Sequence, residues 1–67
     1  MITIQKIENK RTVDGEEAVN VELRGLSTDT KLTEIAGKKI DNGSVFIEID
    51  TGKIFFYDLE NEQWKEF

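Results

Sequence analysis

The amino-acid sequence predicts an all-β fold, a compact antiparallel sheet or β-meander of four or five strands with one ordered loop or short helix. We expect one small domain that spans residues 1–67. Apolar and polar residues alternate over several segments with the period of two that is typical of strands. Asp-Gly and Asn-Gly pairs, which favour tight turns, separate these segments.

The first two strands are expected in the N-terminal part of the chain. Residues 1–8 alternate until Ile7 breaks the phase, which indicates a strand with an irregular end. Residues 18–24 alternate strictly and predict a second strand. We expect these strands to pair as a hairpin, with the Asp14-Gly15 turn inside a long, charged loop over residues 9–17. The apolar residues that face inward on the second strand are Val19, Val21 and Leu23.

The segment 25–43 is the least regular part of the sequence. Leu32, Ile35 and Ala36 have the spacing of one helical face. Two structures therefore stay open for residues 31–36: one or two helical turns, or an ordered loop that Leu32 and Ile35 hold against the core.

The C-terminal third has the clearest strand pattern. Residues 44–49 and 53–57 predict a hairpin, and residues 63–67 predict a short last strand. Because threonine is disfavoured at positive φ, we expect a type I turn at Asp50-Thr51-Gly52 with the glycine in a left-handed bulge position. In this register one face carries Val45, Ile47, Ile49, Phe55 and Tyr57, and the other carries Phe46, Glu48, Ile54 and Phe56.

Both faces of this predicted hairpin are apolar, although a sheet with one face in water is normally polar on that face. Either further strands cover both faces, or one face contacts another molecule. Phe55 is assigned to the core together with Phe56, whereas core and interface are equally open for Trp64 and Phe67. Tryptophan and tyrosine are enriched in the centres of protein interfaces. The sequence therefore predicts a protein-binding surface made by Phe46, Tyr57, Trp64 and Phe67.

Composition and charge exclude several classes of protein. With 14 acidic and 9 basic residues, the net charge is −5, which disfavours direct binding to nucleic acids and to anionic membranes. No apolar segment approaches the roughly 20 residues of a membrane span, and the N-terminus does not resemble a signal peptide. The chain contains no histidine and no cysteine, so we expect no enzymatic activity, no bound metal and no cofactor.

Two short motifs are interpreted as turns. Asp50-Thr51-Gly52 matches the tripeptide of aspartic proteases, but two such carboxylates are needed and strands flank the tripeptide directly, which favours a hairpin loop. Asn42-Gly43-Ser44 matches the glycosylation sequon and is interpreted as a turn, since no secretory signal precedes it.

An acidic cluster near the C-terminus has three interpretations. The first is a solvated turn whose charges protect the sheet edge from aggregation. The second is mimicry of a phosphate backbone, and the third is calcium binding, although the EF-hand pattern is absent. The cluster consists of Asp58, Glu60, Glu62 and Glu66.

A resemblance covers the chain from Gly25 onward. The segments Gly-Leu-Ser-Thr-Asp-Thr-Lys, Asn-Gly-Ser-Val-Phe-Ile-Glu-Ile-Asp-Thr-Gly-Lys, Phe-Tyr-Asp and Asn-Glu-Gln-Trp carry it. They resemble small uncharacterised proteins encoded by tailed phages and prophages of Gram-positive bacteria, although Leu32 stands where proline is expected in that family. The resemblance implies a β-structured phage accessory protein that contacts other proteins, and it implies no catalytic residues.

We therefore expect a non-enzymatic phage or prophage protein that acts through protein–protein contacts, as a virion-associated or assembly component. Its partner is another protein or a second copy of the chain, with homo-oligomers expected, and its location is the virion or the cytoplasm of the bacterial host. The first alternative is a small acidic inhibitor that mimics nucleic acid and binds a host nucleic-acid enzyme. The second is an acid protease dimer that depends on Asp50.

Overall fold

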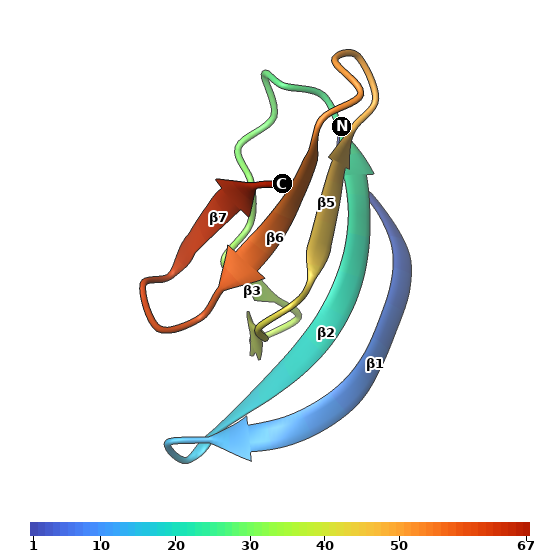
Figure 1. The fold of residues 1–67 in the computed structure, drawn as a ribbon. Coiled ribbons are helices and arrows are strands. Elements are labelled where there is room, and N and C mark those ends of the chain that lie inside the picture. The colour runs from blue at the N-terminus through green and yellow to red at the C-terminus, as the bar shows by residue number, and fades with distance from the viewer.

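The computed structural model describes residues 1–67 and contains seven β-strands in one curled, mixed sheet, with no helix (Figure 1). The all-β prediction is confirmed, but the expected number of four or five strands is wrong, and so is their purely antiparallel arrangement. No helix is long and apolar enough to cross a membrane. The strands are β1 (Thr3–Val13), β2 (Glu16–Gly25), β3 (Glu34–Ile35), β4 (Lys38–Ile40), β5 (Val45–Glu48), β6 (Ile54–Asp58) and β7 (Gln63–Glu66).

β1 and β2 form the long antiparallel hairpin at the right of Figure 1. The pairing is as predicted, but the long charged loop expected over residues 9–17 does not form. Asp14 and Gly15 have φ values of 51° and 80°, the left-handed pair that a two-residue type I′ turn requires. Because this turn matches the strand twist, the ladder continues to Val13 and Glu16.

The phase break at Ile7 corresponds to a bulge in β1. Ile4 pairs with Leu23 and Ile7 pairs with Val21, with a register shift between Ile4 and Lys6. One extra residue in the bulged strand places Ile4 and Ile7 on the same face, although their spacing in the sequence is odd.

β2 is the central strand because its second edge pairs with two others in turn. Ala18 and Val19 pair in parallel with β4, and Glu22–Gly25 pair in parallel with β5. Between these two ladders the Val21 N–H has no ladder partner and donates to the Ser44 hydroxyl at 3.1 Å. The parallel pairings, which correct the antiparallel prediction, arise because the chain from residue 26 crosses back before β5 begins.

The segment before β4 adopts the ordered loop, one of the two structures left open for residues 31–36. Ile35 is buried, Leu32 packs against the core and no helical turn forms. Ala36 and Gly37, at φ values of 50° and 76°, make the turn between β3 and β4. A left-handed pair ends any helix, so the apolar spacing here serves a loop anchored by two side chains.

β5 and β6 form the predicted hairpin, but their register differs by one residue from the predicted one. Phe46 pairs with Phe55, and Glu48 N–H donates to the Lys53 carbonyl, so the loop has four residues, 49–52. Gly52 is left-handed as expected, with φ at 75°. Because a shift of one residue moves every side chain to the other face, the predicted assignment of faces is wrong.

The core lies on the concave face of the sheet, and the loop 26–33, drawn in green beside β6 and β7 in Figure 1, packs against it through Leu32. Its buried apolar side chains come from β2, β3, β4, β5 and β6, and Trp64 of β7 packs against them. They are Val19, Val21, Leu23, Ile35, Ile40, Phe46 and Tyr57.

Candidate protein-binding surface

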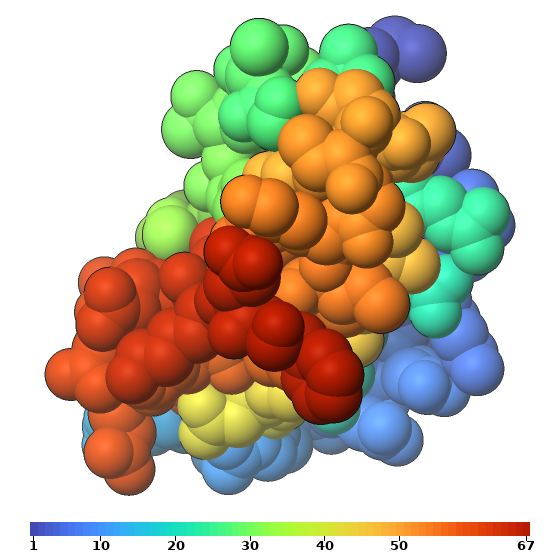
Figure 2. Space-filling model, turned by 45° about the horizontal axis from the view of Figure 1, so that its top comes forward, coloured from blue at the N-terminus to red at the C-terminus, as the bar shows by residue number.

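The convex face of β5, β6 and β7 carries an exposed apolar strip. We call Val45, Ile47, Ile54, Phe56 and Phe67 the outer strip, because all five share the face opposite the core. Ile54 is 39% exposed, Phe56 is 38% exposed and Phe67 is 88% exposed. Figure 2 shows the red C-terminal residues beside the orange atoms of β6 on the front of the molecule. Val45 and Ile47 are half-buried, so Ile54, Phe56 and Phe67 make up most of the apolar surface that the strip leaves in water.

Backbone pairing arranges the strip in two rows that run across the strands. In the first row Phe56 lies between Val45 of β5 and Lys65 of β7. The second row joins Ile47 to Ile54, and the Phe67 N–H donates to the Ile54 carbonyl at 2.8 Å, which continues the row. The rings of Phe56 and Phe67 meet edge to face, with centroids 5.5 Å apart.

Charged residues of β2 and β7 flank the two rows. Parallel pairing places Glu22 beside Val45 and Arg24 beside Ile47. These two side chains form a weak ion pair, with 3.4 Å between Arg24 Nη2 and Glu22 Oε2. On the other side Lys65 Nζ lies 3.4 Å from a carboxylate oxygen of Asp58. The surface therefore has an apolar centre and a charged rim, which is the usual anatomy of a protein interface.

The four residues predicted to form a protein-binding surface do not lie together on one surface. Phe46 is fully buried and Tyr57 is 4% exposed, so both rings belong to the core. Trp64 is half-buried, and its indole N–H donates to the Leu32 carbonyl at 2.8 Å. The centroid of its ring lies 5.9 Å from that of Phe46 and 5.0 Å from that of Tyr57, and both pairs meet edge to face. Of the four, only Phe67 belongs to the outer strip.

The register explains which surface residues the sequence reasoning missed. The prediction that Phe56 belongs to the core is wrong, because its side chain is 38% exposed on the outer face. The sequence reasoning also missed the charged residues beside the strip, although their alternation with core residues already places them on an outward face. These residues are Glu22, Arg24 and Lys65. A four-residue loop at 49–52 would have placed Val45, Ile47, Ile54 and Phe56 on one face.

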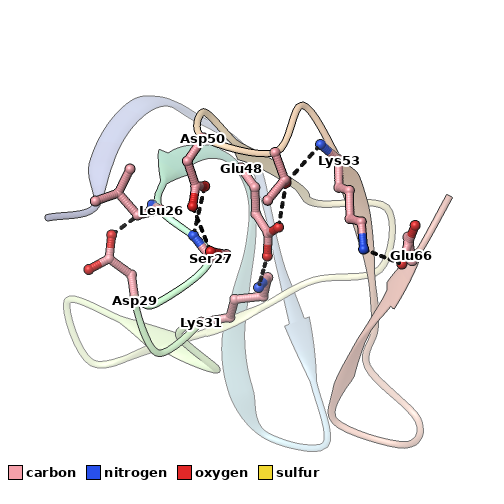
Figure 3. Close-up of polar contacts among 9 residues, drawn as sticks. Leu26, Ser27, Asp29, Lys31, Glu48, Asp50, Lys53 and Glu66 are labelled. Atoms are coloured by element: carbon pink, nitrogen blue, oxygen red, sulfur yellow. Dashed lines mark hydrogen bonds and ion pairs between the residues drawn. The ribbon is translucent and has the colours of Figure 1, made fainter.

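The β5–β6 hairpin holds a buried carboxylate, that of Glu48, next to its loop (Figure 3). Glu48 accepts a hydrogen bond from Lys31 Nζ at 2.7 Å and one from the Thr51 hydroxyl at 2.7 Å. Lys31 Nζ also lies 4.3 Å from the Phe55 ring centroid. The Lys31 ammonium, followed by the Thr51 hydroxyl, holds the pKa of Glu48 below the usual range of a glutamate. These contacts join the ordered loop to the hairpin.

The Asp-Thr-Gly segment forms the loop of this hairpin, as predicted. Asp50 accepts hydrogen bonds from the Ser27 hydroxyl at 2.6 Å and from the Ser27 N–H at 2.9 Å (Figure 3). The Ser27 hydroxyl and N–H hold the pKa of Asp50 below the usual range of an aspartate. This carboxylate therefore ties the loop to the start of the segment that follows β2. The predicted turn at Asn42-Gly43 also forms, with Gly43 at φ 83°.

Most of the carboxylates that lack an ion-pair partner lie at one end of the molecule. Every Lys and Arg side chain has a carboxylate oxygen within 3.8 Å. Five side-chain carboxylates have no ion-pair partner: Asp14, Glu34, Asp50, Glu60 and Glu62. Asp50 lies in the β5–β6 loop, and we call the other four the acidic end. Three of them, Asp14, Glu60 and Glu62, line one surface hollow of about 380 Å³. No group of three His, Cys, Asp or Glu side chains is arranged to hold a metal ion.

The predicted acidic cluster is split between different contacts. Asp58 accepts hydrogen bonds from the Asn61 side chain at 2.7 Å and its N–H at 3.3 Å, which stabilises the β6–β7 turn. Glu66 lies 3.8 Å from Lys53. Glu60 and Glu62 project from the turn and belong to the acidic end.

Comparisons with known proteins do not assign this surface. A scan against protein-family models found no match, and searches of curated proteins and of solved structures found no significant match either.

Proposed function

We propose that this chain is a non-enzymatic accessory protein of a phage or prophage that acts through protein–protein contacts, as a virion-associated or assembly component. The observation that carries the proposed contact is the outer strip, in which Phe56 is 38% exposed and Phe67 is 88% exposed. Exposed apolar patches with charged rims are typical of protein-binding surfaces. The phage assignment rests on the sequence resemblance that starts at Gly25.

The roles of the carboxylates support a non-enzymatic function. Asp41, Glu48 and Asp50 each accept at least two hydrogen bonds, and each joins segments that are distant in the sequence. Asp41 accepts from Arg11 Nη2 at 2.6 Å and from the Asn42 N–H at 2.7 Å. The Arg11 guanidinium holds the pKa of Asp41 below the usual range of an aspartate. Such groups stay ionised and hydrogen-bonded, whereas a general acid or base needs a pKa near the working pH.

A photo-crosslinking experiment tests the contact surface. A photoreactive phenylalanine analogue replaces Phe67 in the outer strip, and in a matched control it replaces Thr12, which is exposed on β1. Both variants are irradiated as purified protein and in an extract of a Gram-positive lysogen that encodes the chain. We expect discrete adducts from position 67 and none from position 12. Absence of adducts at 67 in both samples, or equal adducts at the two positions, would contradict the proposal.

The phage role has a separate test. After prophage induction the particles and their assembly intermediates are separated on a density gradient, and the chain is quantified in each fraction by mass spectrometry. We expect the chain to co-sediment with particles or intermediates. The virion or assembly role is contradicted if the chain is found only in the soluble fraction and its amount is the same with and without induction.

The acidic end favours a second candidate, an acidic inhibitor of a host nucleic-acid enzyme. All unpaired charges near Asp14 and Glu62 are negative, which suits a basic partner that normally binds phosphates. Binding of this kind weakens steeply as salt rises. A partner whose affinity is unchanged between low and high salt, or unchanged by Glu60→Gln with Glu62→Gln, argues against it.

A further inference from the structure

We propose that the partner of the outer strip is the outer strip of a second copy of this chain. The two sheets pack face to face about a two-fold axis that runs parallel to the strands and passes between β5 and β6. This inference rests on the proposed function, because it names the partner for the surface on which that function depends.

The argument starts from the two rows of the outer face. Lys65, Phe56, Val45 and Glu22 lie side by side across β7, β6, β5 and β2. The next row, in the same strand order, is Phe67, Ile54, Ile47 and Arg24. Each row therefore has two apolar residues in its centre and different chemistry at its two ends.

With a two-fold axis parallel to the strands, each row lies opposite the same row of the second copy. The strand order of that row is reversed. Phe56 then lies over Val45 of the second copy, and Ile54 lies over Ile47 of the second copy. Aligned packing of two sheets in this way is the common geometry of β-sandwiches. An isologous interface makes each of these contacts twice.

The ends of the rows match under the same operation. Lys65 faces Glu22 of the second copy, so an ammonium meets a carboxylate. Arg24 faces Phe67 of the second copy, so a guanidinium meets an aromatic ring. The side chains of Lys65, Glu22 and Arg24 are 59%, 40% and 45% exposed, and their internal contacts of 3.4 Å are weak, so they are free to take new partners.

A two-fold axis perpendicular to the strands is the other way to oppose the strips. It sets Arg24 against Glu22 and leaves Lys65 against Phe67 of the second copy. Arginine stacks on aromatic rings more readily than lysine, whose compact ammonium is strongly hydrated. With the parallel axis, Arg24 contacts the Phe67 ring and Lys65 contacts the Glu22 carboxylate. We therefore infer the parallel axis.

Charge and area are both compatible with a dimer. The charged residues beside the strip are two acids, Glu22 and Asp58, and two bases, Arg24 and Lys65, so the surface itself is near neutral despite the net charge of −5. A stable interface buries about 800 Å² on each partner. That is under a fifth of the 4357 Å² surface of this chain.

Charge reversal at one contact tests the axis. Lys65→Glu puts two pairs of carboxylates together in its own dimer, and Glu22→Lys does the same with ammonium groups. In an equimolar mixture of the two variants, however, both contacts of the mixed dimer are again of opposite charge. Lys53→Glu is the matched control, because Lys53 precedes β6, is 53% exposed, and has its Nζ 3.8 Å from Glu66 on the side opposite the outer strip.

Molar mass is measured by light scattering over a hundredfold range of concentration. We expect the wild type and the control to dimerise equally. Each single variant should have a dissociation constant at least about tenfold higher, and the mixture should recover the wild-type value. A mixture as weak as the single variants, or a control as weak as they are, overturns the parallel two-fold dimer.

The outcomes separate this inference from the proposed function. A wild type that is monomeric at every concentration overturns the dimer, whatever the variants do. If the crosslinker at position 67 still forms an adduct with a different protein in the extract, the proposed contact function stands with a foreign partner. If no adduct forms there either, both the dimer and the contact function fail.

Discussion

The replacement Gly25→Ala tests the packing at the point where β2, β5 and the N-terminus meet. A methyl group at Gly25 would lie 2.9 Å from Phe46 Cζ, 3.0 Å from Asp29 Oδ2 and 3.2 Å from Ile2 Cγ1. The Phe46 ring cannot retreat because it is fully buried between the sheet and the ordered loop. Glycine at this position therefore serves close packing, with no left-handed backbone to accommodate.

The expected magnitude is the difference between two opposing effects. Overpacking of a filled core costs about 1–3 kcal/mol. Replacing glycine by alanine restricts the unfolded chain and returns about 0.4–1 kcal/mol. We expect Gly25→Ala to lower the free energy of unfolding by about 1–2 kcal/mol. Urea denaturation, followed by the fluorescence of Trp64, should then show a midpoint lowered by roughly 1–2 M, since m is near 1 kcal/mol per M for a small domain.

A double-mutant cycle identifies the contact that is responsible. Phe46→Leu removes the ring atom that the new methyl group meets, so Gly25→Ala should cost less in that background by about 1 kcal/mol. If Gly25→Ala stabilises the wild type, or if its cost is the same beside Phe46 and Leu, the reasoning about this contact is wrong.

Three further outcomes follow from the polar contacts. The pKa of Glu48 is lowered in the folded state, so its contribution to stability is present above the pKa of an unfolded glutamate and is lost as the pH falls through the folded value. Glu48→Gln should therefore be less stable than the wild type at pH 7. Urea midpoints should show this difference in stability shrinking below about pH 4. Ser44→Ala leaves the Val21 N–H without a partner, which should cost about 1–3 kcal/mol and accelerate hydrogen exchange at that amide, measured by NMR. Trp64→Phe keeps a ring but removes the bond to the Leu32 carbonyl, and thermal unfolding should show a loss of about 1 kcal/mol; an unchanged melting temperature contradicts the role of that bond.

The β5–β6 hairpin shows how far turn chemistry alone can be followed. The Asp-Thr-Gly segment located the turn and predicted the left-handed Gly52 correctly. It did not distinguish a three-residue from a four-residue loop. The Ile49 N–H donates to the Gly25 carbonyl at 2.8 Å, so Ile49 extends the pairing with β2 instead of the hairpin. That contact, from a strand 24 residues away, shifts the register and decides which face is the core.

The predicted aromatic surface failed for the same reason. Phe46 and Phe67 both sit in segments with clear strand alternation, and alternation separates two faces without saying which of them is covered. The loop 26–33 covers the face of Phe46, where Trp64 and Lys31 also lie. The opposite face, with Phe67, receives no cover from this chain.

The sequence by itself determined the all-β class, the positions of the main hairpins, an irregularity in the first strand near Ile7 and the absence of the residues most used in catalysis. These features depend on local alternation, on turn-forming residues and on composition, all of which act over a few neighbouring residues. Tertiary structure decided that β2 pairs in parallel with β4 and then with β5, and that Ser44 bridges the gap between them. It also decided which apolar face remains in water, because only contacts between distant segments choose the register and the face that the connecting loop covers.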